Sequence, residues 1–212
     1  MMEYMKDPKG IEDKSMEIIA PYIAGYDWNE GEKKIASRLI HASGDVGYAE
    51  IIRIHPEALD AGIAALKAGK DIFCDVEMVR TGISKVTLAE LGGQVHCRVS
   101  DPAVAVLAKE KGITRSMAAM RSFGKDLDGA VIAIGNAPTA LFEVLAMCKE
   151  EGIRPALIIG VPVGFVGAAE SKDFLMEISP VPYITVQGNK GGSPIAAAAV
   201  NAILYQIKTD RW

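Results

Sequence analysis

The side chains best suited to acid–base chemistry lie at the end of a predicted helix, residues 29–43. His41 follows Arg38 by three residues, so both side chains share one helical face. The helix ends at once in Ser43-Gly44-Asp45, which adds a carboxylate. A titratable imidazole, a permanent cation and a carboxylate therefore converge, and an imidazole can donate a proton near neutral pH.

The other two histidines have simpler interpretations. His55 precedes Pro56 at a predicted helix start, where a capping or turn role is usual. His96 lies inside the alternating segment QVHCRV, which is typical of a strand. We therefore predict that His41 alone takes part in chemistry.

Three segments in the C-terminal half each run an apolar strand into a glycine-bearing loop and then a small-residue helix. They are residues 130–145, 156–172 and 183–204. Glycines let backbone N–H groups approach a ligand, and a helix N-terminus attracts negative charge. Because such loops meet at the carboxyl ends of parallel strands, we expect one crevice for an anionic ligand. The strongest candidate loop, GNKGGSP, supplies Lys190, Gly191, Gly192 and Ser193, the last of which could cap the following helix.

Two further segments could contact an anion, although each also has a structural interpretation. Arg115 and Ser116 open the predicted helix TRSMAAMRSF, where a guanidinium beside N-terminal amides suits a carboxylate. Arg115 could equally be a solvated surface cation. Thr81 and Gly82 could contact a ligand or simply mark the end of a helix.

Composition excludes several classes of protein. The net charge of −4 gives no basic field for nucleic acid, so any anionic ligand must be held by local Arg and Lys. Neither a dinucleotide-binding G-x-G-x-x-G nor a G-x-x-x-x-G-K-[ST] loop follows any strand. The cysteines, Cys74, Cys97 and Cys148, have neither disulfide nor zinc spacing. With no signal peptide and no membrane-spanning segment expected, the sequence predicts a cytoplasmic protein, and the cysteine spacing predicts no metal site.

Strand and helix patterns alternate along the chain. Helices are predicted at 14–23, 29–43 and 55–69, and then at 102–111, 115–123, 138–151 and 168–176. Apolar strand patterns occur at 71–75, 94–100, 130–134, 156–160 and 183–187. This alternation predicts a single three-layer α/β/α domain over residues 1–212, with a mostly parallel, flavodoxin-like sheet of about five strands.

Six separated blocks resemble one enzyme family, the precorrin-8X methylmutases of cobalamin biosynthesis. The blocks are RLIHASGD, MVRTGI, TRSMAAM, IGNAPTALF, GVPVGFVGAAESK and GGSPIAAAAVNA, in order between Ser15 and Leu204. The resemblance implies a flavodoxin-like homodimer. It also implies an isomerase that moves a methyl group from C-11 to C-12 of precorrin-8X or cobalt-precorrin-8, giving hydrogenobyrinic or cobyrinic acid. Such a methyl shift needs no redox partner and no covalent carrier, so the resemblance implies no cofactor. Whether the substrate itself carries cobalt stays open.

The resemblance also implies roles for particular residues. The histidine of RLIH is the family's proton donor, which is His41, and Arg38 and Ser15 correspond to substrate contacts. By the same resemblance, the pocket is completed by Thr81, Gly82, Arg115, Ser116, Asn136, Lys190, Gly191, Gly192 and Ser193. Asn189 stands where many relatives carry a basic residue, which leaves a cation contact there open.

The chemistry of the substrate agrees with these residues. A flat, apolar macrocycle fringed with carboxylates needs a few cations at its rim and an apolar floor, for which Val161, Val163 and Phe165 are candidates. Two other hypotheses remain: a tetrapyrrole carrier without activity, and a nucleotide- or flavin-dependent oxidoreductase. The helix SPIAAAAVNAILYQI, apolar around most of its circumference, could be covered by a partner subunit or by its own sheet.

Overall fold

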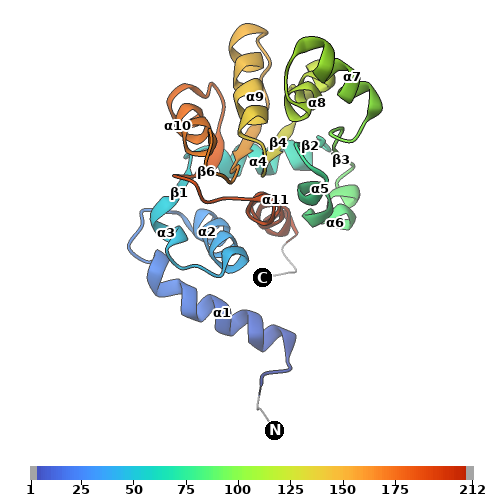
Figure 1. Cartoon of the computed structure of the whole chain (residues 1–212). Helices are drawn as coiled ribbons and strands as arrows, with labels where there is room; N and C mark the ends of the chain where they lie inside the picture. Colours follow the sequence, from blue (N-terminus) through green and yellow to red (C-terminus); the bar gives the residue numbers. More distant parts are fainter. Residues whose placement is uncertain (1–3, 209–212) are drawn as a thin grey trace.

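In the computed structural model, which describes residues 4–208, helices cover both faces of a six-stranded sheet (Figure 1). The strand order across the sheet is β1-β6-β5-β4-β2-β3. The strands are β1 (Ile52–Ile54), β2 (Ile72–Cys74), β3 (Val95–His96), β4 (Val131–Ile134), β5 (Leu157–Gly160) and β6 (Tyr183–Val186).

The five predicted strands are β2 to β6, and they pair in parallel. Their order, β3-β2-β4-β5-β6, is the flavodoxin-like order, in which the chain changes direction across the sheet between β2 and β4. The predicted fold class is therefore confirmed. Ligands of such sheets bind at the carboxyl edge near this switch point.

A sixth strand, β1, was not predicted. It pairs antiparallel with β6, with Ile52 opposite Val186 and Ile54 opposite Ile184. The sequence Ile-Arg-Ile is too short for an alternating pattern, and it follows a four-residue helix, α3 (Tyr48–Ile51). The strand exists because its edge position lets it pair with an already buried neighbour.

Two hydrophobic cores explain the continuous apolar runs of the central strands. In β4, Val131 and Ala133 belong to the core on one face of the sheet, whereas Ile132 and Ile134 belong to the core on the opposite face. A parallel strand covered on both faces needs apolar residues at every position.

The helices form two layers around the sheet (Figure 1). One layer holds α7 (Pro102–Lys111), α8 (Arg115–Phe123), α9 (Pro138–Glu150) and α10 (Ala168–Ile178). The other layer holds α2 (Glu30–Ser43), α4 (Ala58–Lys67), α5 (Glu77–Gly82), α6 (Lys85–Glu90) and α11 (Ser193–Ile207). No helix between residues 4 and 208 is both long and apolar enough to cross a membrane.

Helix α11 is covered by its own chain. It packs against α2, α4 and α5 as well as β4 and β5, and Ile195, Val200 and Leu204 are among its buried residues. This packing accounts for its apolar circumference. The composition of α11 therefore no longer supports a subunit interface.

Helix α1 (Pro8–Ile23) lies on the outside of α2 (Figure 1). It begins six residues before the predicted start, because Asp7 caps it by accepting the backbone N–H of Gly10 at 2.7 Å and Pro8 occupies the first turn. Ser15 lies inside α1, as it does in the predicted helix 14–23, and its hydroxyl donates to the carbonyl oxygen of Ile11 at 2.8 Å.

Candidate active site

Helix α2 presents His41 and Arg38. Asn29 and Glu32 form a reciprocal capping box at its start, with bonds of 2.9 and 2.8 Å, and Gly44 ends it as predicted. Both ends of the helix are thus fixed by local sequence. His41 lies in its last turn and is exposed, so the imidazole is free to meet a ligand.

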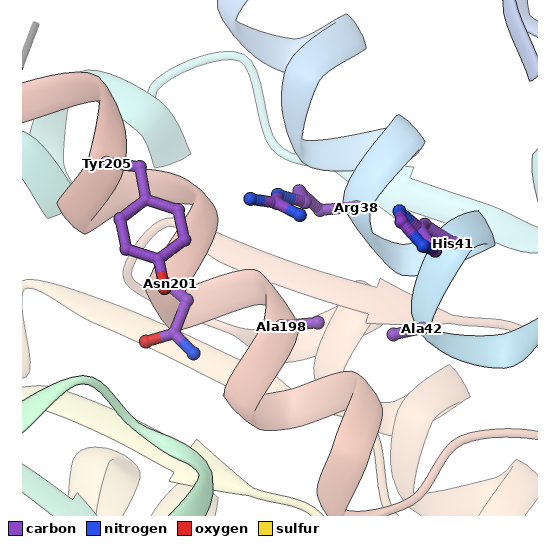
Figure 2. Close-up of a pocket in the computed structure, with 6 residues that line it drawn as sticks. All are labelled: Arg38, His41, Ala42, Ala198, Asn201 and Tyr205. Atoms are coloured by element: carbon purple, nitrogen blue, oxygen red, sulfur yellow. The ribbon is translucent and has the colours of Figure 1, made fainter. Parts of the chain in front are cut away.

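A cavity of about 210 Å³ lies between α2 and α11. Its lining residues are Arg38, His41, Ala42, Ala198, Asn201 and Tyr205. Figure 2 shows the two basic side chains on α2 and the amide and phenol on α11. Asn201 and Tyr205 were not predicted, although Ala198, Asn201 and Tyr205 follow the i, i+3, i+7 spacing of one helical face.

Arg38 connects three helices at this cavity. Its Nη2 lies 3.1 Å from Oε1 of Glu12 on α1, and its guanidinium lies 5.3 Å from the ring centre of Tyr205 on α11. The side chain is therefore held in place by a carboxylate on one side and an aromatic ring on the other. A substrate carboxylate at this position would compete with Glu12.

Asn201 joins the cavity to the end of α5. Its side chain accepts the backbone N–H of Ser84 at 2.8 Å and donates to the carbonyl oxygen of Gly82 at 2.9 Å. A Cβ on Gly82 would lie 2.7 Å from Cβ of Ala197, so only glycine allows α5 to approach α11 this closely. Gly82 ends α5, as one interpretation predicted, and its carbonyl oxygen contacts Asn201, which lines the cavity.

Thr81 is exposed beside Gly82. Its hydroxyl donates to the carbonyl oxygen of Glu77 at 2.5 Å, so the proton is used inside α5. The hydroxyl oxygen can still accept a hydrogen bond from a ligand.

The loop 188–193 reaches the end of α2. Lys190 forms an ion pair with Asp45, and its ammonium lies 5.5 Å from the ring centre of Tyr48. The ion pair lowers the pKa of Asp45 and raises the pKa of Lys190. The carboxylate that the sequence predicted beside His41, Asp45, therefore pairs with Lys190. This contact brings a second cation to the end of α2, the helix that carries His41.

Backbone contacts fix the same loop on the end of β5. The N–H of Gly192 donates to the carbonyl oxygen of Val161 at 2.9 Å. Gly191 has φ of +149°, and a Cβ there would lie 2.3 Å from that same oxygen, so no other residue fits. Gly192 is the residue that precedes α11, and Ser193 is its first, buried residue, so the predicted capping role of Ser193 is wrong.

An internal carboxylate occupies the switch point between β2 and β4. Asp75, fully buried, accepts the backbone N–H groups of Gly135, Asn136 and Ala137 at 3.0, 2.8 and 2.7 Å. Burial raises the pKa of Asp75, and the three hydrogen bonds oppose that rise. These amides were expected to bind a ligand anion, and that expectation is wrong because Asp75 already uses them. A flavin phosphate at this place would meet a carboxylate, which argues against the oxidoreductase hypothesis.

Arg115 and Ser116 begin α8, and Asn136 lies just before α9; these two helices pack together in the other helical layer. Thr114 caps α8 by accepting the N–H of Met117, and its hydroxyl lies 2.9 Å from that of Thr139 at the start of α9. Arg115 and the side chain of Asn136 are exposed. The predicted site residues thus form two groups on opposite faces of the sheet. One group, with His41 and Arg38, lies in the layer of α2 and α11, and the other lies at the starts of α8 and α9.

The remaining predictions have mixed outcomes. His55 accepts the N–H of Glu57 through Nδ1, and His96 pairs with Asp71 at 2.8 Å, so both have structural partners. Val161 is fully buried and cannot form a floor for the substrate, whereas Phe165 is 91% exposed. The side chain of Asn189 is exposed, and its carbonyl oxygen accepts the N–H of Gly164.

Fold and site together define a doubly wound α/β protein with a histidine and an arginine at one cavity and with an internal carboxylate bound to the amides of its switch point. A sequence model of precorrin-8X methylmutase matches residues 10–206. The chain therefore belongs to the precorrin-8X methylmutase family, whose members are isomerases of cobalamin biosynthesis.

Individual relatives cover nearly the whole chain. The precorrin-8X methylmutase of Pseudomonas aeruginosa is 44% identical over 204 residues, which cover 96% of this chain and 98% of the relative. The cobalt-precorrin-8 methylmutase of Leptospira interrogans is 42% identical, covering 92% of each chain. A solved structure of the precorrin-8X methylmutase of Thermus thermophilus superposes with a TM-score of 0.85 at 34% identity, covering 94% of this chain and 98% of that one.

Proposed function

We propose that this enzyme moves the C-11 methyl group of a corrin precursor to C-12, with His41 as the proton donor. The observation that carries the proposal is the position of His41, exposed at the α2–α11 cavity beside Arg38. Membership of the methylmutase family supports the reaction. Relatives named as precorrin-8X and as cobalt-precorrin-8 methylmutases are 44% and 42% identical to this chain, so both substrates fall within the proposal.

The proposed chemistry is a rearrangement that needs one proton. Protonation of a ring nitrogen draws electrons away from the macrocycle and favours migration of the methyl group with its bonding pair. The proton lost from the ring afterwards restores the acid, so the atoms of substrate and product balance. We propose that no separate cofactor takes part.

The size of the cavity limits how the substrate binds. At about 210 Å³ it is smaller than the usual range for drug-sized ligands, so it suits one edge of the macrocycle and its acidic arms. Arg38 at the cavity and Lys190 beside Asp45 at the end of α2 provide cations for these arms, in exchange for Glu12 and Asp45. We propose that Arg115, Ser116 and Asn136 contact arms elsewhere on the rim.

The family resemblance also supports a homodimer in the cytoplasm as part of this proposal. Helix α1 offers a surface for the contact, because Ile11, Ile18 and Tyr22 are exposed along it. A two-fold axis near α1 would place the two cavities close to the interface.

Replacement of His41 tests the proposal. His41→Ala should reduce turnover of the purified enzyme by at least about a hundredfold while product affinity changes less than about tenfold, because a general acid acts on the transition state. His55→Ala is the matched control and should keep wild-type turnover. Wild-type turnover by His41→Ala would refute the assignment, and product binding without turnover by the unaltered enzyme would favour a carrier.

A further inference from the structure

Lys172 is a buried basic group that the proposed reaction does not use. It lies in the second turn of α10, and its side chain is fully buried. Burying an amine is unfavourable unless it makes a well-placed hydrogen bond. Burial lowers the pKa of Lys172 to about 8, and the neighbouring charge of Asp173 opposes this change.

The ammonium group of Lys172 is directed at the loop 188–193, which carries Lys190. It donates to the carbonyl oxygen of Lys190 at 2.6 Å. A hydrogen bond from a charged donor is short and about twice as strong as one between neutral groups. Lys172 therefore fixes the orientation of the peptide that follows Lys190.

Two other bonds attach the same loop to the segment between β5 and α10. The N–H of Gly164 donates to the oxygen of Asn189 at 3.1 Å, and the N–H of Gly192 donates to the oxygen of Val161 at 2.9 Å. The oxygen of residue 190 lies between these two anchors in sequence, and Lys172 supplies the bond there. Three successive attachments leave the side chain of Lys190 extending toward Asp45 and the end of α2.

We propose that Lys172 is a positioning residue that acts through Lys190. It holds the loop so that the Lys190 ammonium stands at the end of α2, where a substrate carboxylate can replace Asp45. The inference rests on the proposed function, because the reaction supplies the ligand that Lys190 meets. His41 lies on a different element, so substrate affinity depends on Lys172 more than the chemical step does.

Lys172→Met tests this role, because methionine fills a similar volume without a charge or donor. The variant should raise KM and the product Kd about tenfold, the effect of misplacing one charge-assisted contact, with kcat within about threefold of wild type. Ser171→Ala is the control, since that buried hydroxyl bonds only within α10, to the oxygen of Ala168, and affinity should stay within about twofold. Wild-type KM in Lys172→Met would overturn the inference.

A double-mutant cycle shows whether Lys172 acts through Lys190. Lys190→Ala and the double variant Lys172→Met/Lys190→Ala should bind product equally within about twofold, because the second change removes nothing further. Independent, multiplying losses would contradict the proposal. If Lys172→Met does not fold, Lys172→Gln is measured against the same expectations, because its shorter arm cannot reach the same oxygen.

Hydrogen exchange separates this inference from the proposed function. Without any corrinoid, backbone amides of residues 189–192 should exchange about tenfold faster in Lys172→Met than in wild type. Unchanged exchange would overturn the anchoring role. Faster exchange in a protein whose wild-type form binds no corrinoid would instead refute the proposed function and leave the anchor established.

Discussion

Replacing Asp75 with alanine removes one carboxylate and leaves three buried or part-buried N–H groups, of Gly135, Asn136 and Ala137, without an acceptor. Each buried donor left unsatisfied costs about 1–3 kcal/mol, and release of a buried charge returns part of that sum. We expect the free energy of unfolding to fall by about 3–5 kcal/mol, a large share of the stability of an ordinary domain.

Urea unfolding at constant pH measures this loss. Asp75→Asn should lose less, about 1–3 kcal/mol, because one oxygen can still accept the N–H groups of Asn136 and Ala137. Asp101→Ala is the matched control: this exposed carboxylate caps α7 through one N–H, of Ala103, and should cost about 1 kcal/mol. Formate should partly restore the unfolding midpoint of Asp75→Ala, because the small anion can occupy the vacated position.

One result would refute this reasoning. If Asp75→Ala loses no more stability than Asp101→Ala and gains nothing from formate, then Asp75 does not hold the loop that follows β4. The switch point would in that case be open to an external anion.

Three further predictions concern Asn201, Lys172 and the assembly. Asn201→Ala should lower the free energy of unfolding in urea by about 1–3 kcal/mol, because it leaves the N–H of Ser84 and the carbonyl oxygen of Gly82 without their hydrogen-bond partner. A loss of less than about 0.5 kcal/mol would show that these two hydrogen bonds do not stabilise the contact between α5 and α11. The pKa of Lys172 is lower in the folded than in the unfolded chain, so the unfolded state binds more protons between about pH 8 and 10.5. Wild type should therefore gain stability relative to Lys172→Met as pH rises through that window, by up to about 1.4 kcal/mol per pH unit. A difference in the free energy of unfolding that does not change with pH would contradict the lowered pKa of Lys172. Light scattering should give a mass near twice 22.6 kDa, and a value near 22.6 kDa would exclude the dimer.

Much of the fold could be predicted because its signals are local. Continuous apolar runs identified β2, β4, β5 and β6, an alternating segment identified β3, and alternation with helices predicted the parallel sheet. Helix α2 was recognised from its acidic start and from Gly44 at its end. Strand β1 was missed because three residues at a sheet edge carry no periodic pattern.

The candidate site was predictable only where its members share one element. Arg38 and His41 lie three residues apart on α2, so their common face follows from helical geometry alone. The apolar pattern of α11 hid Asn201 and Tyr205, which face the cavity only because that helix packs beside α2.

The sequence by itself determined the local elements, because each depends on residues close together in the chain, and the family, because its motifs occur in the same order along the chain. Only the tertiary structure decided how separate loops use one another. Asp75 meets Ala137 across 62 positions, and Lys190 meets Asp45 across 145. No local pattern records such contacts, because they arise when burial of the two cores brings together loops that are distant in the chain. The glycine loops thus looked open to ligands in the sequence, whereas the folded chain binds much of their backbone with its own carboxylate, carbonyls and buried lysine.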